Sequence, residues 1–314
     1  MACLFLAVSS LKLTQVMKKV SRFLVACFAL TALTLFAGSP PITITVTTTF
    51  DYPGTGNSTF PYGINNSGDI AGYYVDTNLI TRGFTRLHTG VFSNPIVEPN
   101  DTGGFTRAFG INRSRNIDGD FFNVADNTYH GYFRTGHSYT QFDFPASEST
   151  DLFGLNDAGD FCGAGLDSVS GIVQAYVSIG GTSSIISLPA GATLGSAHGM
   201  NNSDEVVGIY EDSAGNFHGF LRDTNGTVIS PIDYPGAVST TPQGISDRGI
   251  IVGRYNNADL VLHAFILKLP HTFISYDYPG ATATSFNDIN IRNTIAARYT
   301  DTGGVAHGFI AQLQ

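Results

Sequence analysis

Hydrophobic residues in this 314-residue chain recur in short alternating runs that are separated by turn-forming residues. In the run "DIAGYY" (residues 69–74), Ile70 and Tyr74 share one face of a strand, because side chains alternate between the two faces with a period of two. The preceding "NNSG" supplies Asn and Gly, which suit a tight hairpin turn. No helical period follows residue 39. The pattern therefore predicts an all-β protein of short antiparallel strands.

This pattern occurs six times along the chain. Aligned on the segment "GIN", the copies are spaced by 47, 44, 45, 45 and 44 residues and start at Gly63, Gly110, Gly154, Gly199, Gly244 and Asp288. Each copy holds four strand-like segments, of the types "GIN", "DIAGYY", "HGF" and "FDYPG". Four short strands per repeat of about 45 residues are typical of one blade of a β-propeller.

The order of the segments indicates how the ring closes. The chain enters the first copy with a fourth-type segment, Thr47–Gly54, and ends after the third-type segment of the sixth copy. Pairing these two segments removes the open sheet edges that an unclosed ring would expose. We therefore predict a six-bladed β-propeller with four antiparallel strands per blade, closed by N-terminal strand pairing with the last repeat. It forms a single domain over residues 41–314.

The repeats resemble a known family. "GMNNSDEVVGIY…HGFL" and "GISDRGIIVGRY…HAFI" are similar to the bacterial HAF-type extracellular repeat, whose triplet stands here as His263-Ala264-Phe265. The similarity runs from about Phe50 to the end. It implies an exported repeat protein and brings no catalytic residue set. Three copies depart from the pattern, with Arg82 and Gln174 in place of His and Asp288 in place of Gly.

The first forty residues predict export. Lys18, Lys19 and Arg22 precede an apolar run, Phe23–Phe36, which is followed by small residues as in a secretory signal peptide. The run is shorter than the roughly 20 residues of a membrane-spanning helix. We expect a signal peptide over residues 1–40, cleaved near residues 37–41, with residues 1–16 as an over-extended start. The mature protein is then secreted or at the cell surface without a transmembrane span. Anchoring as a lipoprotein at Cys27 is the alternative.

Charge and cysteine content exclude several classes of function. Beyond Ser39 stand 12 basic and all 25 acidic residues, a net charge of −13. Such a surface repels phosphate backbones, so we expect no nucleic-acid partner. Cys162 alone remains after the leader, which rules out an intramolecular disulfide and a cysteine metal site. We expect a monomer without a cofactor.

Side chains kept in every copy are assigned to the fold. The predicted core comprises Ile70, Ile117, Phe161, Val206, Ile251 and Ile295 with the rings of Tyr74, Phe121, Tyr210, Tyr255 and Tyr299. We expect the second-strand glycines to let adjacent blades approach: Gly72, Gly119, Gly163, Gly208 and Gly253. Four His at matching sites (His130, His218, His263 and His307) are expected to bond a neighbouring blade's loop, since equivalent positions lie too far apart for one metal ion. The turns lack the alternating carboxylates of a calcium loop, so no metal site is predicted.

Asymmetry between the copies indicates a candidate ligand site. One second-strand position is occupied by Tyr73, Asp120, Ala164, Ile209, Arg254 and Arg298, on the face that also carries Asp118. We take Tyr73, Asp118, Asp120, Arg254 and Arg298 as candidate ligand-binding residues. If the "GIN" strand is innermost, a polar ring also lines the channel: Asn65, Asn112, Asn156, Asn201, Ser246 and Asn290. The alternative for these Asn is that they cap their own turns.

No catalytic motif is present: the chain has no G-x-S-x-G, no H-E-x-x-H and no phosphate-binding loop. We therefore predict a non-enzymatic binding module that holds a carbohydrate, peptide or protein ligand at a propeller face. The alternative is an exported glycan hydrolase or lyase at the channel mouth, with Asp118 and Asp120 as a carboxylate pair. Gathering of these two residues with Arg254 and Arg298 near the axis favours the enzyme, and positions scattered along the rim favour binding.

Overall fold

The strands follow the predicted repeat. The computed structural model describes residues 42–54, 56, 58–270 and 272–314, and Ile44–Gln314 form one structural unit. The predicted leader, its cleavage region and Cys27 lie outside these residues. Regular structure in the described ranges consists of strands β1 to β23. No helix there is long and apolar enough to cross a membrane.

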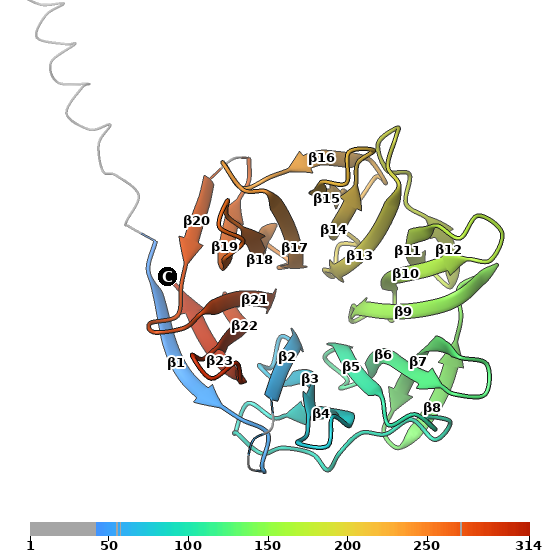
Figure 1. Ribbon diagram of the computed structural model, residues 1–314, viewed down its shortest axis with the longest axis horizontal. Helices are drawn as coiled ribbons and strands as arrows, with labels where there is room; N and C mark the ends of the chain where they lie inside the picture. Colours follow the sequence, from blue (N-terminus) through green and yellow to red (C-terminus); the bar gives the residue numbers. More distant parts are fainter. Residues whose placement is uncertain (1–41, 55, 57, 271) are drawn as a thin grey trace, which may run out of the picture. The chain divides into compact units, whose positions relative to one another are not determined.

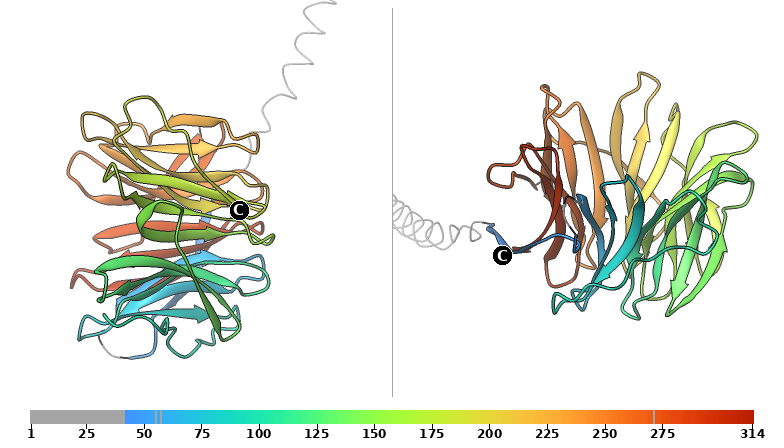
Figure 2. Two further views of the ribbon diagram at one scale, coloured as in Figure 1. Left: turned by 90° about the vertical axis from the view of Figure 1, so that its right-hand side faces the viewer. Right: turned by 60° about the horizontal axis from the view of Figure 1, so that its bottom comes forward.

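Six antiparallel sheets stand around a central axis (Figure 1). Seen from the side, their strands run from one face of the ring to the other (Figure 2). Blade 1 contains β2 (Ser58–Ile64), β3 (Ile70–Val75) and β4 (Thr81–Arg86); blade 2 contains β5 (Thr106–Ile111), β6 (Ile117–Asn123), β7 (Thr128–Thr135) and β8 (Ser138–Phe142); blade 3 contains β9 (Ser147–Leu155), β10 (Phe161–Asp167), β11 (Val173–Ile179) and β12 (Thr182–Ile185). Blade 4 contains β13 (Leu194–Met200), β14 (Val206–Glu211), β15 (Phe217–Arg222) and β16 (Val228–Ile232); blade 5 contains β17 (Ser239–Ile245), β18 (Ile250–Asn256), β19 (Leu262–Lys268) and β20 (Thr272–Tyr276); blade 6 contains β21 (Ala283–Ile289), β22 (Thr294–Thr300), β23 (Ala306–Leu313) and β1 (Ile44–Phe50).

The six-bladed propeller predicted from the repeats is confirmed, including its closure. β1 runs antiparallel to β23, from Ile44 opposite Leu313 to Phe50 opposite Gly308 (Figure 1). Blade 1 differs from the other blades. Its sheet has three strands, and single antiparallel bridges at Phe92 and Ile96 occupy the place of the fourth.

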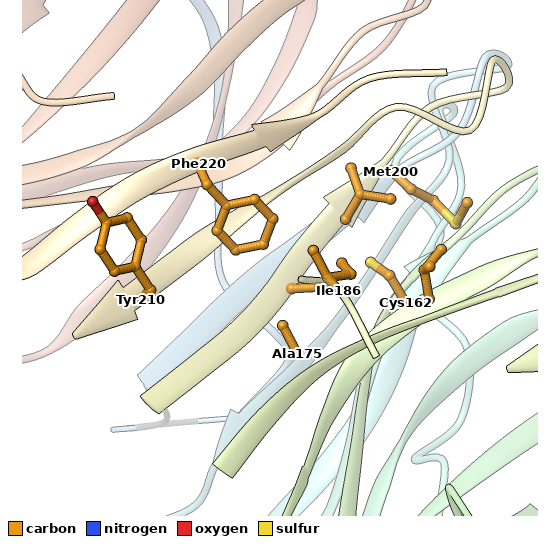
Figure 3. Close-up of a cluster of buried hydrophobic side chains, with 9 residues drawn as sticks. Cys162, Ala175, Ile186, Met200, Tyr210 and Phe220 are labelled. Carbon is orange, nitrogen blue, oxygen red and sulfur yellow. The ribbon is translucent and has the colours of Figure 1, made fainter. Parts of the chain in front are cut away.

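Each blade buries its sheet against the next one. The first set of second-strand residues predicted as core is buried in all six copies, from 0% exposed at Ile70 to 7% at Phe161. Of the predicted rings, Tyr74, Phe121, Tyr210 and Tyr255 are buried, whereas Tyr299 is only half-buried. Between blades 3 and 4, Cys162 and Ala175 pack with Met200 and Phe220 (Figure 3). Because one four-stranded sheet cannot cover both of its own faces, the neighbouring copies provide the cover. This explains why the chain repeats one pattern.

The "DYPG" segment links the outer strand of one blade to the next blade. Tyr278 stacks on Tyr299 with ring centroids 3.9 Å apart, and its N–H donates to Thr284 Oγ1 at 2.9 Å. Blade 5 is thereby fixed to blade 6. The same stacking recurs in the pairs Tyr52–Tyr74 and Tyr234–Tyr255. In blade 3, where Gly165 stands at the second-strand ring position, Phe144 stacks instead on Tyr176 of the third strand.

The four matching His bond within their own sheet, so the expected contact with a neighbouring blade's loop is wrong. His218 Nδ1 lies 2.8 Å from Asp233 Oδ2, at the end of the fourth strand of the same blade, and His130, His263 and His307 contact Asp143, Asp277 and Asp51 in the same way. Adjacent antiparallel strands place these residues opposite each other. Burial acts to lower the pKa of His218, but the carboxylates of Asp233 and Asp212 raise it overall.

The glycines that let blades approach are also not the ones predicted. A Cβ on the inner-strand Gly199 would lie 2.4 Å from the carbonyl oxygen of Gln243 in the next blade, and 3.0 Å from Gly244 Cα. On the second-strand Gly208, a Cβ would instead meet the carbonyl oxygen of Ser196 in the same sheet at 2.1 Å. Inner-strand glycines therefore make the contact between blades, whereas second-strand glycines accommodate the irregular inner strand beside them.

Candidate functional site

The innermost strands surround an axial cavity. These strands are β2, β5, β9, β13, β17 and β21, which stand innermost in the ring (Figure 1). Residues of all six strands line the cavity. The cavity has a volume of about 60 Å³, room for a few water molecules. The "GIN" segments line it, as the sequence predicted for an innermost strand.

A β-bulge in each inner strand turns one side chain toward the axis. The pairing register shifts directly before the "GIN" segment in all six copies, and a bulge re-aims the side chain that it leaves unpaired. We call these residues the bulge ring: Tyr62, Phe109, Phe153, His198, Gln243 and Asn287. The alternation of side chains along the strands does not single out these residues. The available signal was the residue before each "G", which differs in nearly every copy.

The bulge ring is aromatic on one side and polar on the other. Tyr62 meets Phe109 edge-to-face with centroids 4.6 Å apart, Phe109 meets Phe153 at 4.9 Å, and Phe153 meets His198 at 5.5 Å. Gln243 Nε2 lies 3.0 Å from His198 Nδ1. These contacts pack most of the ring side chains against one another across the blades.

On one side of the bulge ring, the hairpin turns form what we call the turn mouth. The predicted Asn ring lies here and is engaged by the fold. Asn65 Oδ1 accepts hydrogen bonds from Ser67 and Asp69 N–H at 3.0 and 2.9 Å, and its Nδ2 donates to the Asn112 carbonyl of the next blade at 3.1 Å. Asn112, Asn201 and Asn290 repeat this bond to the next blade, while Asn156 donates to Asp204 instead. These amides cap turns and connect blades.

On the other side of the bulge ring, the variable second-strand residues converge. Arg254 of blade 5 lies close enough to Tyr62 and Tyr73 of blade 1 to interact electrostatically, although blade 6 stands between them. Arg298 interacts with Tyr73 and places its guanidinium 5.2 Å from the Phe60 ring centroid. Residues of non-adjacent blades can meet in this way only near the axis. We call this group, with Arg107 and Asp120, the arginine end of the channel.

Within the arginine end, Arg107 forms ion pairs with two carboxylates. It pairs with Asp120 through two nitrogens, with Nε at 2.8 Å from Oδ1, and its NH2 lies 3.4 Å from Asp151 of blade 3. Burial acts to lower the pKa of Arg107, but Asp120 and Asp151 raise it overall. Burial and the neighbouring Asp120 raise the pKa of Asp151 well above its usual range.

Arg254 and Arg298 differ from Arg107 because they have no counter-ion. Within the described ranges, neither guanidinium makes a hydrogen bond or an ion pair. None of their nitrogens is among the fully buried polar atoms that lack a partner, so solvent reaches them. Burial, and then the charge of Arg298, lower the pKa of Arg254.

His198 lies next to this group in the bulge ring. Its Nδ1 is 3.1 Å from the Pro242 carbonyl oxygen. Burial and then the charge of Arg254 lower its pKa to about 4. His198 is therefore neutral at pH 7, and its Nδ1 lies within hydrogen-bond distance of both the Pro242 carbonyl oxygen and Gln243 Nε2.

Asp118 does not join the arginine end. Its Oδ1 accepts a hydrogen bond from Gly110 N–H at 2.5 Å, and its Oδ2 has no partner in the part of the chain that the structure describes. The carboxyl group that lies beside Asp120 is Asp151, which was not among the residues predicted from the sequence. No group of three or more His, Cys, Asp or Glu in the described ranges could hold a metal ion.

Comparison with known proteins shows similarity of fold. No protein-family model matches the sequence, and no curated protein matches it, so the resemblance to the HAF-type repeat stays a prediction. The chain is similar to a mutant of the Aleuria aurantia lectin in complex with Fucα1-6GlcNAc (12% identity, TM-score 0.52), covering 82% of this chain and 94% of the lectin. It is also similar to AofleA from Arthrobotrys oligospora (11% identity, TM-score 0.51), covering 86% of each chain. Against TolB from Acinetobacter baumannii (11% identity, TM-score 0.46), the match covers 81% of this chain and 55% of that one. At these identities the likeness concerns the propeller fold alone.

Proposed function

We propose that the protein is a non-enzymatic binding module that takes a small ligand, or one residue of a larger one, at the arginine end of the channel. One observation carries this proposal. The six copies agree where they build the sheets, and they differ where Tyr73, Asp120, Arg254 and Arg298 converge on the axis. A repeat scaffold needs identical contacts between blades, so divergence concentrated at one point supports a function there.

Carbohydrates, peptides and proteins all remain candidate ligands. Phe60 and Tyr73 stack at 4.8 Å and form an aromatic wall beside polar side chains, which suits a ligand with both a flat apolar face and polar groups. The Aleuria aurantia lectin shares the propeller fold. The leader over residues 1–40 supports export of the mature monomer, so the ligand would be met outside the cytoplasm.

Removal of single hydroxyl groups tests the place of binding. Protein from residue 40 onward is screened against immobilised glycans and peptides, and the ligands found are titrated against Tyr62→Phe and Tyr73→Phe. We expect several-fold weaker binding, because both phenols border the arginine end. The matched control is Tyr139→Phe on the outer strand β8, which leaves affinity unchanged. Ligands that bind all three variants as well as wild type would place the site on the rim and refute the proposal.

A glycan hydrolase or lyase is the second candidate, because three of the four residues named for it do meet near the axis. However, Arg107 binds Asp120 bidentately, and Asp118 faces a backbone N–H. The carboxyl pair expected for acid–base catalysis is thus Asp120 with Asp151, directly beside a guanidinium. Release of reducing ends or unsaturated sugars from acidic polysaccharides, lost in Asp151→Asn, would establish the enzyme.

A further inference from the structure

Arg254 and Arg298 of the arginine end have no counter-ion in the part of the chain that the structure describes. Arg107, the third arginine of this region, is neutralised by Asp120 and Asp151. Arg254 and Arg298 lie on adjacent blades, are partly buried and influence each other electrostatically, yet no described carboxylate contacts either of them. Like charges held together in a poorly solvated place are destabilising unless an opposite charge joins them.

The fold itself does not require arginine at this position. The equivalent residues in blades 3 and 4 are Ala164 and Ile209, and their blades pack into the same ring with the same strand register. Apolar side chains therefore satisfy the scaffold here. The comparison of equivalent positions among the blades indicates that the two guanidinium groups have a role other than stabilising the sheet.

The surroundings of the pair suit a group that accepts hydrogen bonds. In the pairing register, Arg254 lies opposite Thr241 and Arg298 lies opposite Ser285 on the inner strands. The Ser285 hydroxyl donates to Asn287 Oδ1 at 2.7 Å. The phenols of Tyr62 and Tyr73 make no hydrogen bond within the described ranges and add two further donors. The region beyond Ser39 has a net charge of −13, so this unpaired positive pair stands in an acidic protein.

We propose that Arg254 and Arg298 together bind an oxyanion group of the ligand: a carboxylate, a sulfate or a phosphate. This inference rests on the binding function proposed above and names the chemistry recognised there. Guanidinium groups bind such planar or tetrahedral oxyanions through paired N–H donors, and two of them on one anion neutralise each other's repulsion. A single acidic residue of a polysaccharide or a free small anion fits a site made by two side chains, whereas a polyanion would be repelled by the surrounding surface.

Thermal unfolding with matched small probes tests the inference. Wild-type protein is titrated with D-galacturonate, sulfate and inorganic phosphate, with D-galactose and chloride at equal ionic strength as the neutral and simple-ion controls. We expect at least one oxyanion to raise the unfolding temperature, and galactose to have no effect. In Arg254→Gln and Arg298→Gln the apparent affinity for that anion falls about tenfold or more, as for loss of one charged hydrogen-bond partner. Which probe acts distinguishes carboxylate from sulfate or phosphate.

Two further measurements keep the test decisive. Arg248→Gln, an exposed arginine at the turn mouth of the same blade as Arg254, should respond to anions like wild type. In anion-free buffer, Arg254→Gln and Arg298→Gln should unfold at the same or a higher temperature than wild type, because each removes a repulsion. The inference is overturned if no oxyanion exceeds chloride, if all variants respond equally, or if both arginine variants are less stable without anions. If a neutral ligand loses affinity in Tyr62→Phe while no oxyanion binds, the proposed binding site stands and the oxyanion inference alone fails.

Discussion

Asp288 makes the pH dependence of stability a direct test of the blade contacts. It occupies the position that is glycine in the other five copies. Its Oδ2 accepts a hydrogen bond from Ile64 N–H at 2.9 Å across the contact between blades 6 and 1. Burial raises its pKa to about 7, although backbone N–H groups oppose the shift. Asp288→Asn removes the titrating proton and keeps an oxygen acceptor in the same place.

The sign and size of the effect follow from this pKa. A carboxyl group whose pKa is higher in the folded state stabilises the protein at low pH, and this stabilisation is lost as the pH rises from about 4 through about 7. The slope is about 1.4 kcal/mol per pH unit, so wild type should lose about 3 kcal/mol between pH 4.5 and 7 through this group. Asp118, whose pKa burial also raises to about 7, titrates in both proteins and cancels in their difference.

Urea unfolding of wild type and Asp288→Asn across this pH range measures the difference. The stability of wild type relative to the variant should fall by about 3 kcal/mol as the pH rises from about 4.5 to 7. Asp259→Asn, on an exposed loop, should follow wild type throughout. If Asp288→Asn keeps the full pH dependence of wild type, Asp288 is ionised in the fold and the account of this contact is wrong.

Three further changes test the packing of the ring. Gly199→Ala should lower the free energy of unfolding in urea by about 1–3 kcal/mol, because the new Cβ would lie 2.4 Å from a carbonyl oxygen of the next blade. The control Gly303→Ala should lower it by less than about 0.5 kcal/mol, because the nearest neighbour of its Cβ is a flexible carboxylate at 3.3 Å. Equal losses in the two variants would contradict the close approach of the blades at Gly199. Tyr278→Ala removes the stacking on Tyr299 and should cost about 2 kcal/mol, and an unchanged unfolding midpoint would count against the stack as a stabilising link. Deleting Ile44–Phe50 exposes the edge of β23, so the truncated protein should self-associate in size-exclusion chromatography. An added peptide with the sequence of Ile44–Phe50 should reverse this association. A stable monomeric truncated protein would show that closure of the ring by β1 is dispensable.

The fold was predictable because repetition compensates for weak local signals. A single copy such as residues 63–107 reads only as a few short strands, but six copies at nearly constant spacing specify a ring, and the surplus fourth-type segment around Phe50 specifies its closure. The site was predictable in part. Tyr73, Asp120, Arg254 and Arg298 stood out because they break the repetition, and they do converge.

The parts that sequence reasoning missed have one physical origin. A bulge inserts an extra residue, and beyond it the rule of alternating faces is reversed. For that reason the residues that reach the axis, such as His198, could not be separated from core residues by alternation alone. The bulge also brings the inner strand against Gly208 of its own sheet, which led to the wrong assignment of the second-strand glycines. Asp151 was missed because its partner Arg107 lies in another repeat, and contacts between repeats are not visible in any single one.

The pairing of β1 with β23 has a consequence for the newly made chain. β1 is synthesised before β23 and cannot pair with it until β23 has left the ribosome, so the ring cannot close before that point. Until then β1 is free to add itself to the last sheet of another molecule. At high local concentration such an exchange would produce a domain-swapped dimer. Every native contact of β1 would be preserved, but β1 would pair with the β23 of the other chain.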